Sequence, residues 1–249
     1  MKLLDWVKRL LRKLIRSKRT KMANKKTTQE IAIINKVLQL KPSIIKSIAN
    51  AIHHSVKGNS LNDYKIVWNQ LQEIATPQIK KILETSFKGC SIEVTKSKST
   101  YPDLKLNFSG FNFAFDIKSN ESSKEPWYDI ARLDSIQKER LDKYSEEFDV
   151  VIKYDSNTGK LLDIYFEIMR HTVGLNSKCN GVKFRPYDGK LRPKPWADFK
   201  NGKLYWPDEE DFLKGIRNSQ LYRWKILIKE TFVKILTKEE KQEFKKLFD

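Results

Sequence analysis

The order of helical and strand-like segments predicts a mixed α/β fold of the α+β type, a central mixed β-sheet flanked by helices. Apolar residues recur at helical spacing in the first third of the chain, alternate in the middle, and return to helical spacing at the end. Strands grouped between helical stretches indicate a sheet covered by helices. Hydrophobic residues make up 39% of the chain, which is enough to form a buried core.

Residues 1–24 are predicted to form a basic amphipathic leader. Leucines and other apolar residues of 2–16 share one helical face, and residues 1–21 hold nine Lys and Arg against one Asp. Such a helix can lie on an anionic membrane or along a phosphate backbone. An upstream extension that the packed domain does not need is the equal alternative, since Met22 begins a stretch that looks like an ordinary protein start.

The remaining elements follow from periodicity and turn residues. Helices are predicted over 28–54, where Pro42 opens the second of two, and over 63–87, with a kink at Pro77. Alternation predicts strands at 91–95, 104–108 and 111–118, the last two joined in a hairpin. The other predicted elements are a helix over 127–147, strands at 148–154 and 161–169, loops over 174–207 and helices over 208–249.

The hairpin carries three candidate catalytic residues, Asp103, Asp116 and Lys118. Residues two apart on a strand face the same side, about 6.6–6.8 Å apart, so Asp116 and Lys118 share one face while the alternate apolar residues point to the core. Closing the hairpin brings Asp103 beside Asp116. Two carboxylates can hold Mg²⁺, which activates water and neutralises phosphate charge, and a nearby ammonium stabilises developing charge. A solvated strand face with an ordinary Asp–Lys pair is the alternative.

The net charge of +18 favours a polyanionic partner, either nucleic acid or an anionic membrane surface. The sequence has no apolar run near the roughly 18–20 residues that span a bilayer and no signal-peptide pattern, so no stable membrane association and a cytoplasmic location are expected. Cys90 and Cys179 are predicted to be free thiols. His53, His54 and His171 have no metal spacing and are interpreted as structural or surface residues.

Two segments resemble the motif of the PD-(D/E)xK nuclease superfamily, and more specifically that of EcoRV-like type II restriction endonucleases. They are Tyr101-Pro102-Asp103-Leu104 and Phe115-Asp116-Ile117-Lys118-Ser119. Upstream, 72–82 resembles that family's helix with a further active-site glutamate, and downstream, 197–218 resembles its C-terminal region. The resemblance, which covers about residues 63–225, implies a restriction-endonuclease-like core. It divides a single domain, 25–249, into a helical and dimerisation part (25–90), a catalytic sheet (91–170), DNA-recognition loops (171–207) and C-terminal helices (208–249).

Carried over by position, the resemblance implies metal-binding roles for Asp103 and Asp116 and a catalytic role for Lys118. It implies an accessory catalytic and metal-binding role for Glu73, whose alternative is an ordinary exposed helix glutamate. The candidate DNA-binding residues are Lys96, Lys98, Asn176, Asn180, Arg185, Lys190, Arg192 and Lys194. The loop region 176–194 is richer in cations and proline than the family's loop, which implies a different recognition sequence. For each cation, a phosphate contact or a solvated charge is the alternative.

The hypothesis that follows is a Mg²⁺-dependent type II site-specific deoxyribonuclease acting on double-stranded DNA. A homodimer is expected because a palindromic site matches a two-fold protein, and the resemblance implies 5′-phosphate ends. Three alternatives stay open: a repair or structure-specific nuclease of the same fold, a non-catalytic DNA-binding protein, and a membrane-surface protein anchored by residues 2–16.

Overall fold

The centre of the fold is a five-stranded mixed sheet. A computed structural model describes residues 26–56, 67, 70–95, 101–122, 125–155 and 157–232; the predicted leader, Lys96 and Lys98 lie outside them. The strands run in the order β1-β2-β3-β4-β5, with β3 and β4 parallel and the other neighbours antiparallel. Their bounds are β1 Ser91–Val94, β2 Leu104–Phe108, β3 Phe111–Glu121, β4 Glu146–Tyr154 and β5 Leu161–Ile168. The predicted fold class is confirmed.

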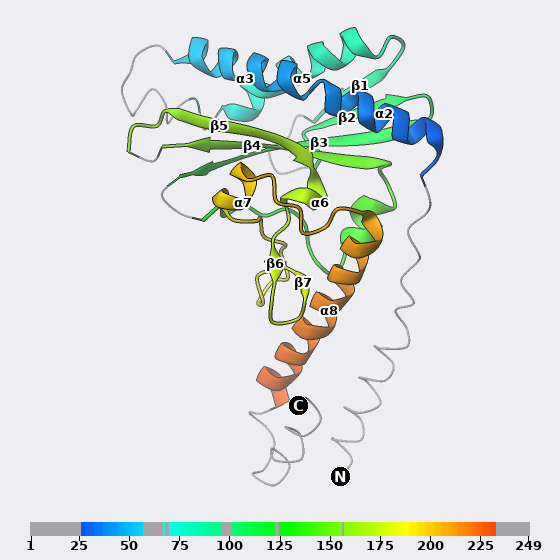
Figure 1. Cartoon of the computed structure of the whole chain (residues 1–249), viewed down its shortest axis with the longest axis vertical. Helices are drawn as coiled ribbons and strands as arrows, with labels where there is room; N and C mark the ends of the chain where they lie inside the picture. Colours follow the sequence, from blue (N-terminus) through cyan, green and yellow to red (C-terminus); the bar gives the residue numbers. More distant parts are fainter. Residues whose placement is uncertain are drawn as a thin grey trace.

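Three helices cover one face of this sheet: α2 (Thr28–Gln39), α3 (Lys41–Ser55) and α5 (Leu71–Ser86) (Figure 1). Thr27 and Glu30 form a capping box that starts α2, and Pro42 lies in the first turn of α3, where a missing N–H costs nothing. The apolar faces of the helices pack on the odd-numbered residues of β3 in the first hydrophobic core. Of the expected helix over 63–87, α5 covers Leu71–Ser86 and continues through Pro77, and Val67 is also helical.

The opposite face carries a second core built from loops, short elements and one long helix. The short elements are α6 (Met169–Thr172), the hairpin of β6 (Leu175–Asn176) and β7 (Gly181–Val182), and α7 (Trp196–Lys200); the long helix is α8 (Glu209–Phe232). In Figure 1 they lie across the sheet from α3 and α5, and α8 extends away from it. None of the described helices combines the length and the apolar character needed to cross a membrane.

The connection between β3 and β4 corrects one prediction: no long helix forms over 127–147. Residues 127–147, all of them described, contain only a single π-helical turn, η1 (Gln137–Leu141), and β4 already begins at Glu146. The cause is tertiary, because this segment pairs with a distant loop. Ile130 N–H donates to Leu191 O at 3.3 Å, and Leu133 N–H donates to Gly189 O at 2.7 Å. Long-range pairing and burial in the second core outweigh helical propensity here.

Alternation along β3 places the polar residues as predicted. Phe113 and Phe115 are fully buried in the core beneath the helices, and Ile117 packs against the same core. Asp116 and Lys118 therefore face the other side of the sheet. The same rule puts Glu147 and Asp149 of β4 on that second face, because Phe148 and Val150 belong to the first core.

Candidate active site

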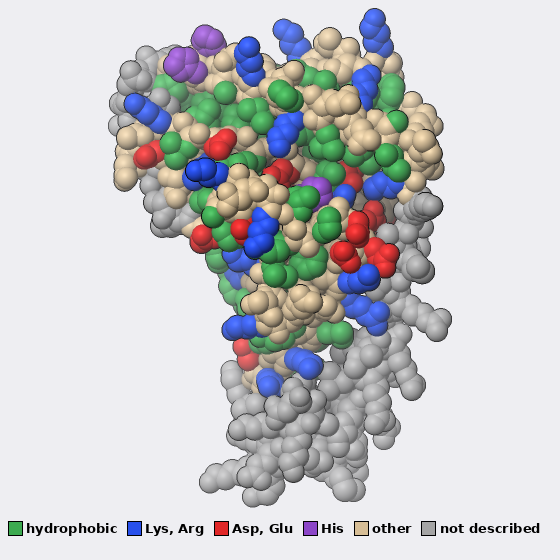
Figure 2. Space-filling view, viewed as in Figure 1, with side chains coloured by type: hydrophobic (Ala, Val, Ile, Leu, Met, Phe, Trp, Pro, Cys, Tyr) green, Lys and Arg blue, Asp and Glu red, His purple; other side chains and the backbone are tan. Residues whose placement is uncertain are grey.

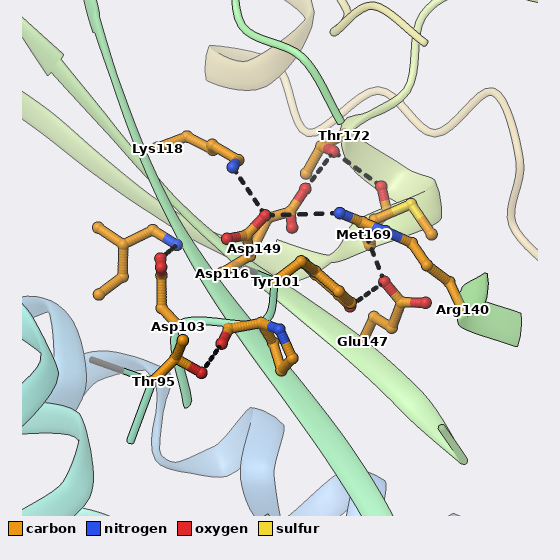
Figure 3. A network of polar contacts seen from close by, with 12 residues as sticks. Thr95, Tyr101, Asp103, Asp116, Lys118, Arg140, Glu147, Asp149, Met169 and Thr172 are labelled. Atoms are coloured by element: carbon orange, nitrogen blue, oxygen red, sulfur yellow. Dashed lines mark hydrogen bonds and ion pairs between the residues drawn. The ribbon is translucent and has the colours of Figure 1, made fainter. Parts of the chain in front are cut away.

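Asp103 and Asp116 lie side by side where β2 begins. Leu104 is paired with Phe115, so the residue before Leu104 falls next to Asp116. The backbone N–H of Ile117 donates to Asp103 Oδ2 at 2.6 Å, which fixes this carboxylate against β3 (Figure 3). Burial, and then the charge of Asp116, raise the pKa of Asp103. Holding both carboxylates ionised therefore calls for a positive charge between or beside them.

Lys118 supplies part of that charge. Its Nζ lies 2.8 Å from Asp116 Oδ2, and the two side chains are 24% and 6% exposed, so the lysine side chain is the more exposed of the two. Burial acts to lower the pKa of Lys118, but the charges of Asp116, Asp149 and Asp103 outweigh burial, and the pKa is raised. Lys118 therefore keeps its positive charge beside the carboxylate pair.

Asp149 is a third carboxylate in this row. It is the register partner of Asp116 on β4 and is almost completely buried. Thr172 Oγ1 donates to Asp149 Oδ2 at 2.7 Å and so links β4 to α6. Burial, reinforced by Asp116, raises the pKa of Asp149 to about 7. Asp149 thus holds a proton more readily than an ordinary Asp, which eases the repulsion at its neighbour.

Behind the carboxylates, Tyr101, Arg140 and Glu147 form a buried cluster. The Arg140 guanidinium carbon lies 3.5 Å from the centre of the Tyr101 ring. Arg140 Nη1 lies 3.2 Å from Glu147 Oε2, and Nη2 lies 3.8 Å from Asp116 Oδ2. The Tyr101 hydroxyl donates to the same Glu147 oxygen (Figure 3). Arg140 is consequently a second cation beside Asp116, fixed in place by an aromatic ring and a carboxylate.

On the helical side, the residue that contacts Asp103 is Gln72 of α5. Its Nε2 donates to Asp103 Oδ1 at 2.7 Å. The predicted accessory glutamate, Glu73, is exposed and lines an adjacent cavity instead. A step of one residue turns a helix by about 100°, which separates these two side chains. The metal-binding role of Glu73 stays a prediction.

The donor set suits a small hard cation. Both Asp103 and Asp116 offer carboxylate oxygens, and Mg²⁺ is commonly bound by one or two carboxylates with water and substrate phosphate completing the shell. Within the described ranges no group of three or more His, Cys, Asp or Glu is arranged to hold a metal ion. A two-carboxylate site fits that observation, because the remaining positions then belong to water and substrate.

The candidate DNA-binding residues fall into different environments. Lys194 is fully buried, with its ammonium 2.8 Å from Glu167 Oε2, and it packs beside the Phe199 ring. Arg192 is also buried, where it pairs with Asp129 at 2.7 Å. Lys194 and Arg192 are therefore held within the protein and have almost no surface to offer to DNA.

Arg185 and Lys190 are half-buried near the surface and already have acidic partners. Arg185 binds Asp188, and Lys190 binds Asp129. Asn176 and Asn180 flank the β6–β7 turn, where Asn180 is exposed and adopts a positive φ of 47°. On the face shown in Figure 2, Lys and Arg side chains are spread among acidic and apolar ones rather than gathered into a single patch.

Several site residues escaped the sequence prediction. Asp149 and Glu147 carried a usable signal, since both stand beside the apolar residues of β4 and buried acids need a reason. Arg140 had none, because a loop that was expected to be helical brings it to the site. Gln72 was passed over in favour of its acidic neighbour.

Comparison with known proteins gives a distant structural likeness. No protein-family model matches the sequence, and neither does any curated protein. Among solved structures, the chain is similar to NlaIV restriction endonuclease with a TM-score of 0.43 and 15% identity, over 68% of this chain and 75% of that one. The more specific resemblance to EcoRV-like enzymes stays a prediction.

Proposed function

We propose that this chain is a Mg²⁺-dependent nuclease that hydrolyses phosphodiester bonds in double-stranded DNA, in the manner of a type II restriction endonuclease. The observation that supports this most directly is the meeting of Asp103 and Asp116 from neighbouring strands, with Lys118 Nζ 2.8 Å from the Asp116 carboxylate. Two adjacent acids and an accessible ammonium are the groups that metal-assisted phosphoryl chemistry requires. The net charge of +18 suits the polyanionic substrate.

Asp103 and Asp116 are the residues that would hold Mg²⁺. Bound there, Mg²⁺ would lower the pKa of a coordinated water and neutralise charge on the phosphate oxygens. Asp103 suits this role because Ile117 N–H and the Gln72 amide orient its two oxygens from two sides. Preorganisation of this kind spares the cost of reordering the ligands when substrate arrives.

Lys118 and Arg140 have separate tasks in this proposal. The Lys118 side chain is partly exposed, so its ammonium can contact a non-bridging phosphate oxygen and stabilise the negative charge that grows there. Arg140 is buried under Tyr101 and bound to Glu147, so it acts on Asp116 from behind and does not reach substrate. Arg140 is a positioning residue, whereas Lys118 is proposed as a catalytic one.

Sequence-specific cleavage by a homodimer is the finer form of the proposal. It draws on the sequence resemblance and on the loop region around Asn176, Asn180, Arg185 and Lys190, where polar groups suited to base edges are grouped. One observation favours a second candidate, a structure-specific nuclease: Arg185 and Lys190 are already paired with Asp188 and Asp129, which leaves less charge for base contacts. In that case DNA shape would determine where the enzyme cuts.

The test is cleavage of a defined genomic DNA with Mg²⁺, followed by sequencing of the ends. Wild type is expected to cut and to lose activity in EDTA. Asp116→Asn is expected to lose at least about 100-fold in rate, the scale for removing a main stabilising group. Asp142→Asn, at an exposed position, is the matched control and should cut normally. DNA binding without any Mg²⁺-dependent cutting would refute the nuclease proposal, and ends with random sequence would favour the structure-specific candidate.

A further inference from the structure

Two large aromatic side chains, Trp127 and Tyr187, are exposed beside each other on the surface. They are 60% and 72% exposed, whereas a Trp usually buries most of its surface. The Arg185 guanidinium carbon lies 5.8 Å from the centre of the Trp127 ring and 4.6 Å from the centre of the Tyr187 ring. The two rings are therefore neighbours around one cation, and we call Trp127, Arg185 and Tyr187 the aromatic platform.

Arg192 covers one side of the Trp127 ring. Its guanidinium carbon is 3.8 Å from the ring centre, and its side chain, only 3% exposed, pairs with Asp129 at 2.7 Å. Because one side of the ring rests on a buried guanidinium, the exposed surface of Trp127 belongs mainly to the other side and the edges. Trp127 thus offers a ring face on which another flat group can stack.

The loop that carries Tyr187 is held in place by hydrogen bonds. The backbone N–H of Arg185 donates to Lys190 O at 2.8 Å and closes the loop. Arg223 of α8 donates through Nε to the Pro186 carbonyl at 3.0 Å and through Nη2 to the Tyr187 carbonyl at 3.4 Å. A ring on a loop that is already ordered loses little conformational entropy when a ligand binds to it.

The aromatic platform adjoins the face of the sheet that carries the proposed catalytic centre. The backbone N–H of Trp127 donates to Asn120 Oδ1 at 3.1 Å. Asn120 lies two residues beyond Lys118 on β3, so both side chains point to the same side, about 6.6–6.8 Å apart. Successive nucleotides advance only about 3.4 Å along a helix axis, so a DNA strand with a phosphate at Lys118 reaches Trp127 within a few nucleotides.

The aromatic platform suits a base better than a phosphate. Arg185 and Lys190 already pair with Asp188 and Asp129, so their charge is largely balanced. Stacking on an aromatic ring or a guanidinium plane needs no free charge and is open to every base. In a duplex the face of each base is covered by its neighbours, so only a base that has left the stack can offer its face to a protein.

We infer that the aromatic platform stacks an unpaired base of the DNA strand whose phosphate is held at Lys118. The inference rests on the proposed nuclease function and narrows its substrate class to duplex DNA with unpaired nucleotides beside the cleavage position. Trp127 and Tyr187 are binding residues in this arrangement and take no part in bond cleavage.

Binding in EDTA tests the aromatic platform without cleavage. A labelled duplex with a short gap of unpaired thymidines is compared with the same duplex fully paired. We expect wild type to bind the gapped duplex at least about fivefold more tightly, the lower end of the effect of stacking one base. Tyr187→Ala should reduce this preference, and Leu162→Ala, which removes an exposed apolar side chain from β5, should retain it. Equal Kd values of wild type for the two duplexes would overturn the inference.

Trp127 is tested by two substitutions that keep an apolar side chain over Arg192. Trp127→Phe keeps an aromatic ring, whereas Trp127→Leu does not. A 2-aminopurine base in the gap reports stacking directly, because its fluorescence falls when it stacks on an aromatic ring. At saturating protein we expect wild type and Trp127→Phe to quench this fluorescence, and Trp127→Leu combined with Tyr187→Ala to leave it bright. Quenching by the double variant equal to that of wild type would overturn the inference.

Two further outcomes separate this inference from others. If wild type prefers the gapped duplex but never cuts DNA with Mg²⁺, the nuclease proposal fails, whereas stacking of an unpaired base on the aromatic platform is supported. Trp, Tyr and Arg are also the residues that most often anchor protein interfaces. If Tyr187→Ala lowers the sedimentation coefficient and leaves the preference for the gapped duplex unchanged, the aromatic platform joins two copies of this chain, which overturns the inference.

Discussion

The guanidinium of Arg140 lies beneath Tyr101, 3.5 Å from the ring centre, and both side chains bind Glu147. A cation, a ring and a carboxylate thus form one buried unit directly behind Asp116. Stacking on an aromatic ring stabilises the positive charge of a desolvated guanidinium and restricts its motion. Strand β3 is therefore supported from the second face of the sheet by a charge that the solvent does not screen.

Removing this charge should destabilise the fold. Above pH 7, where Glu147 is ionised, Arg140→Met leaves its buried carboxylate without a cation, and loss of one partner of a buried pair costs about 3–5 kcal/mol. The free energy of unfolding from urea titration in EDTA measures the effect. Arg132→Met, at an exposed position, is the control and should change stability by less than about 0.5 kcal/mol. An Arg140→Met protein as stable as wild type would contradict the proposed support.

Stability should fall as pH rises towards neutrality. Burial raises the pKa of Glu147 to about 7, despite the attraction of Arg140, against an ordinary value of 4.5. The folded protein keeps this proton where the unfolded chain has lost it, so the stabilisation is complete below pH 4.5 and declines up to about pH 7.

Glu147→Gln should remove this part of the pH dependence. Because a tenfold difference in proton affinity between the folded and unfolded chain corresponds to about 1.4 kcal/mol, the wild type should lose on the order of 2–3 kcal/mol between pH 4.5 and 7 relative to the variant. Urea titrations of both proteins across that interval measure this loss. Parallel curves for the two proteins would show that Glu147 does not titrate in this interval.

The central sheet could be predicted because strand periodicity is a local property. Alternation in 111–118 correctly placed Phe115 towards the core and Asp116 with Lys118 on the other face. The turn at Ser109-Gly110 then fixed the hairpin register that sets Asp103 beside Asp116. These residues are close in sequence, so local rules were sufficient to bring them together.

The rest of the site depends on long-range contacts that local rules do not contain. Arg140 reaches Asp116 only because residues 130–133 pair with a loop far along the chain and the expected long helix does not form. Asp149 meets Asp116 through a parallel pairing of β3 with β4. The contact of Gln72 with Asp103 depends on how α5 packs on the sheet, which the periodicity of the helix alone does not give.

Lys194 should matter for stability rather than for DNA binding. Its ammonium is fully buried against Glu167, so Lys194→Met leaves an uncompensated buried carboxylate and should cost about 3–5 kcal/mol. Lys194→Met with Glu167→Gln should recover much of that loss, since both charges are then absent. Thermal unfolding and duplex affinity are measured together. A large loss of affinity with unchanged stability would return Lys194 to the DNA interface.

Lys118 should affect the chemical step. Lys118→Met removes an ammonium 2.8 Å from Asp116, and we expect the single-turnover cleavage rate to fall about 10²–10³-fold, as for loss of one charge-stabilising donor. Duplex affinity should change little, because one cation among many is lost. Lys105→Met on the neighbouring strand β2, whose ammonium binds Glu93, is the matched control. A rate within a few-fold of wild type would remove Lys118 from catalysis.

Gln72 and Glu73 give opposite predictions for the metal site, and comparing them separates orientation of a ligand from direct ligation. Gln72 donates to Asp103 Oδ1 at 2.7 Å, so Gln72→Ala should loosen this ligand and lower both Mg²⁺ affinity and cleavage rate about 10–100-fold, as other residues that orient metal ligands do. Glu73, the next residue on α5, is exposed to solvent. Glu73→Gln should therefore leave the Mg²⁺ concentration for half-maximal rate nearly unchanged. The measurement is cleavage rate against Mg²⁺ concentration for wild type and both variants. A large rightward shift for Glu73→Gln, with little effect of Gln72→Ala, would instead make Glu73 a metal ligand that swings towards Asp103 when the cation binds.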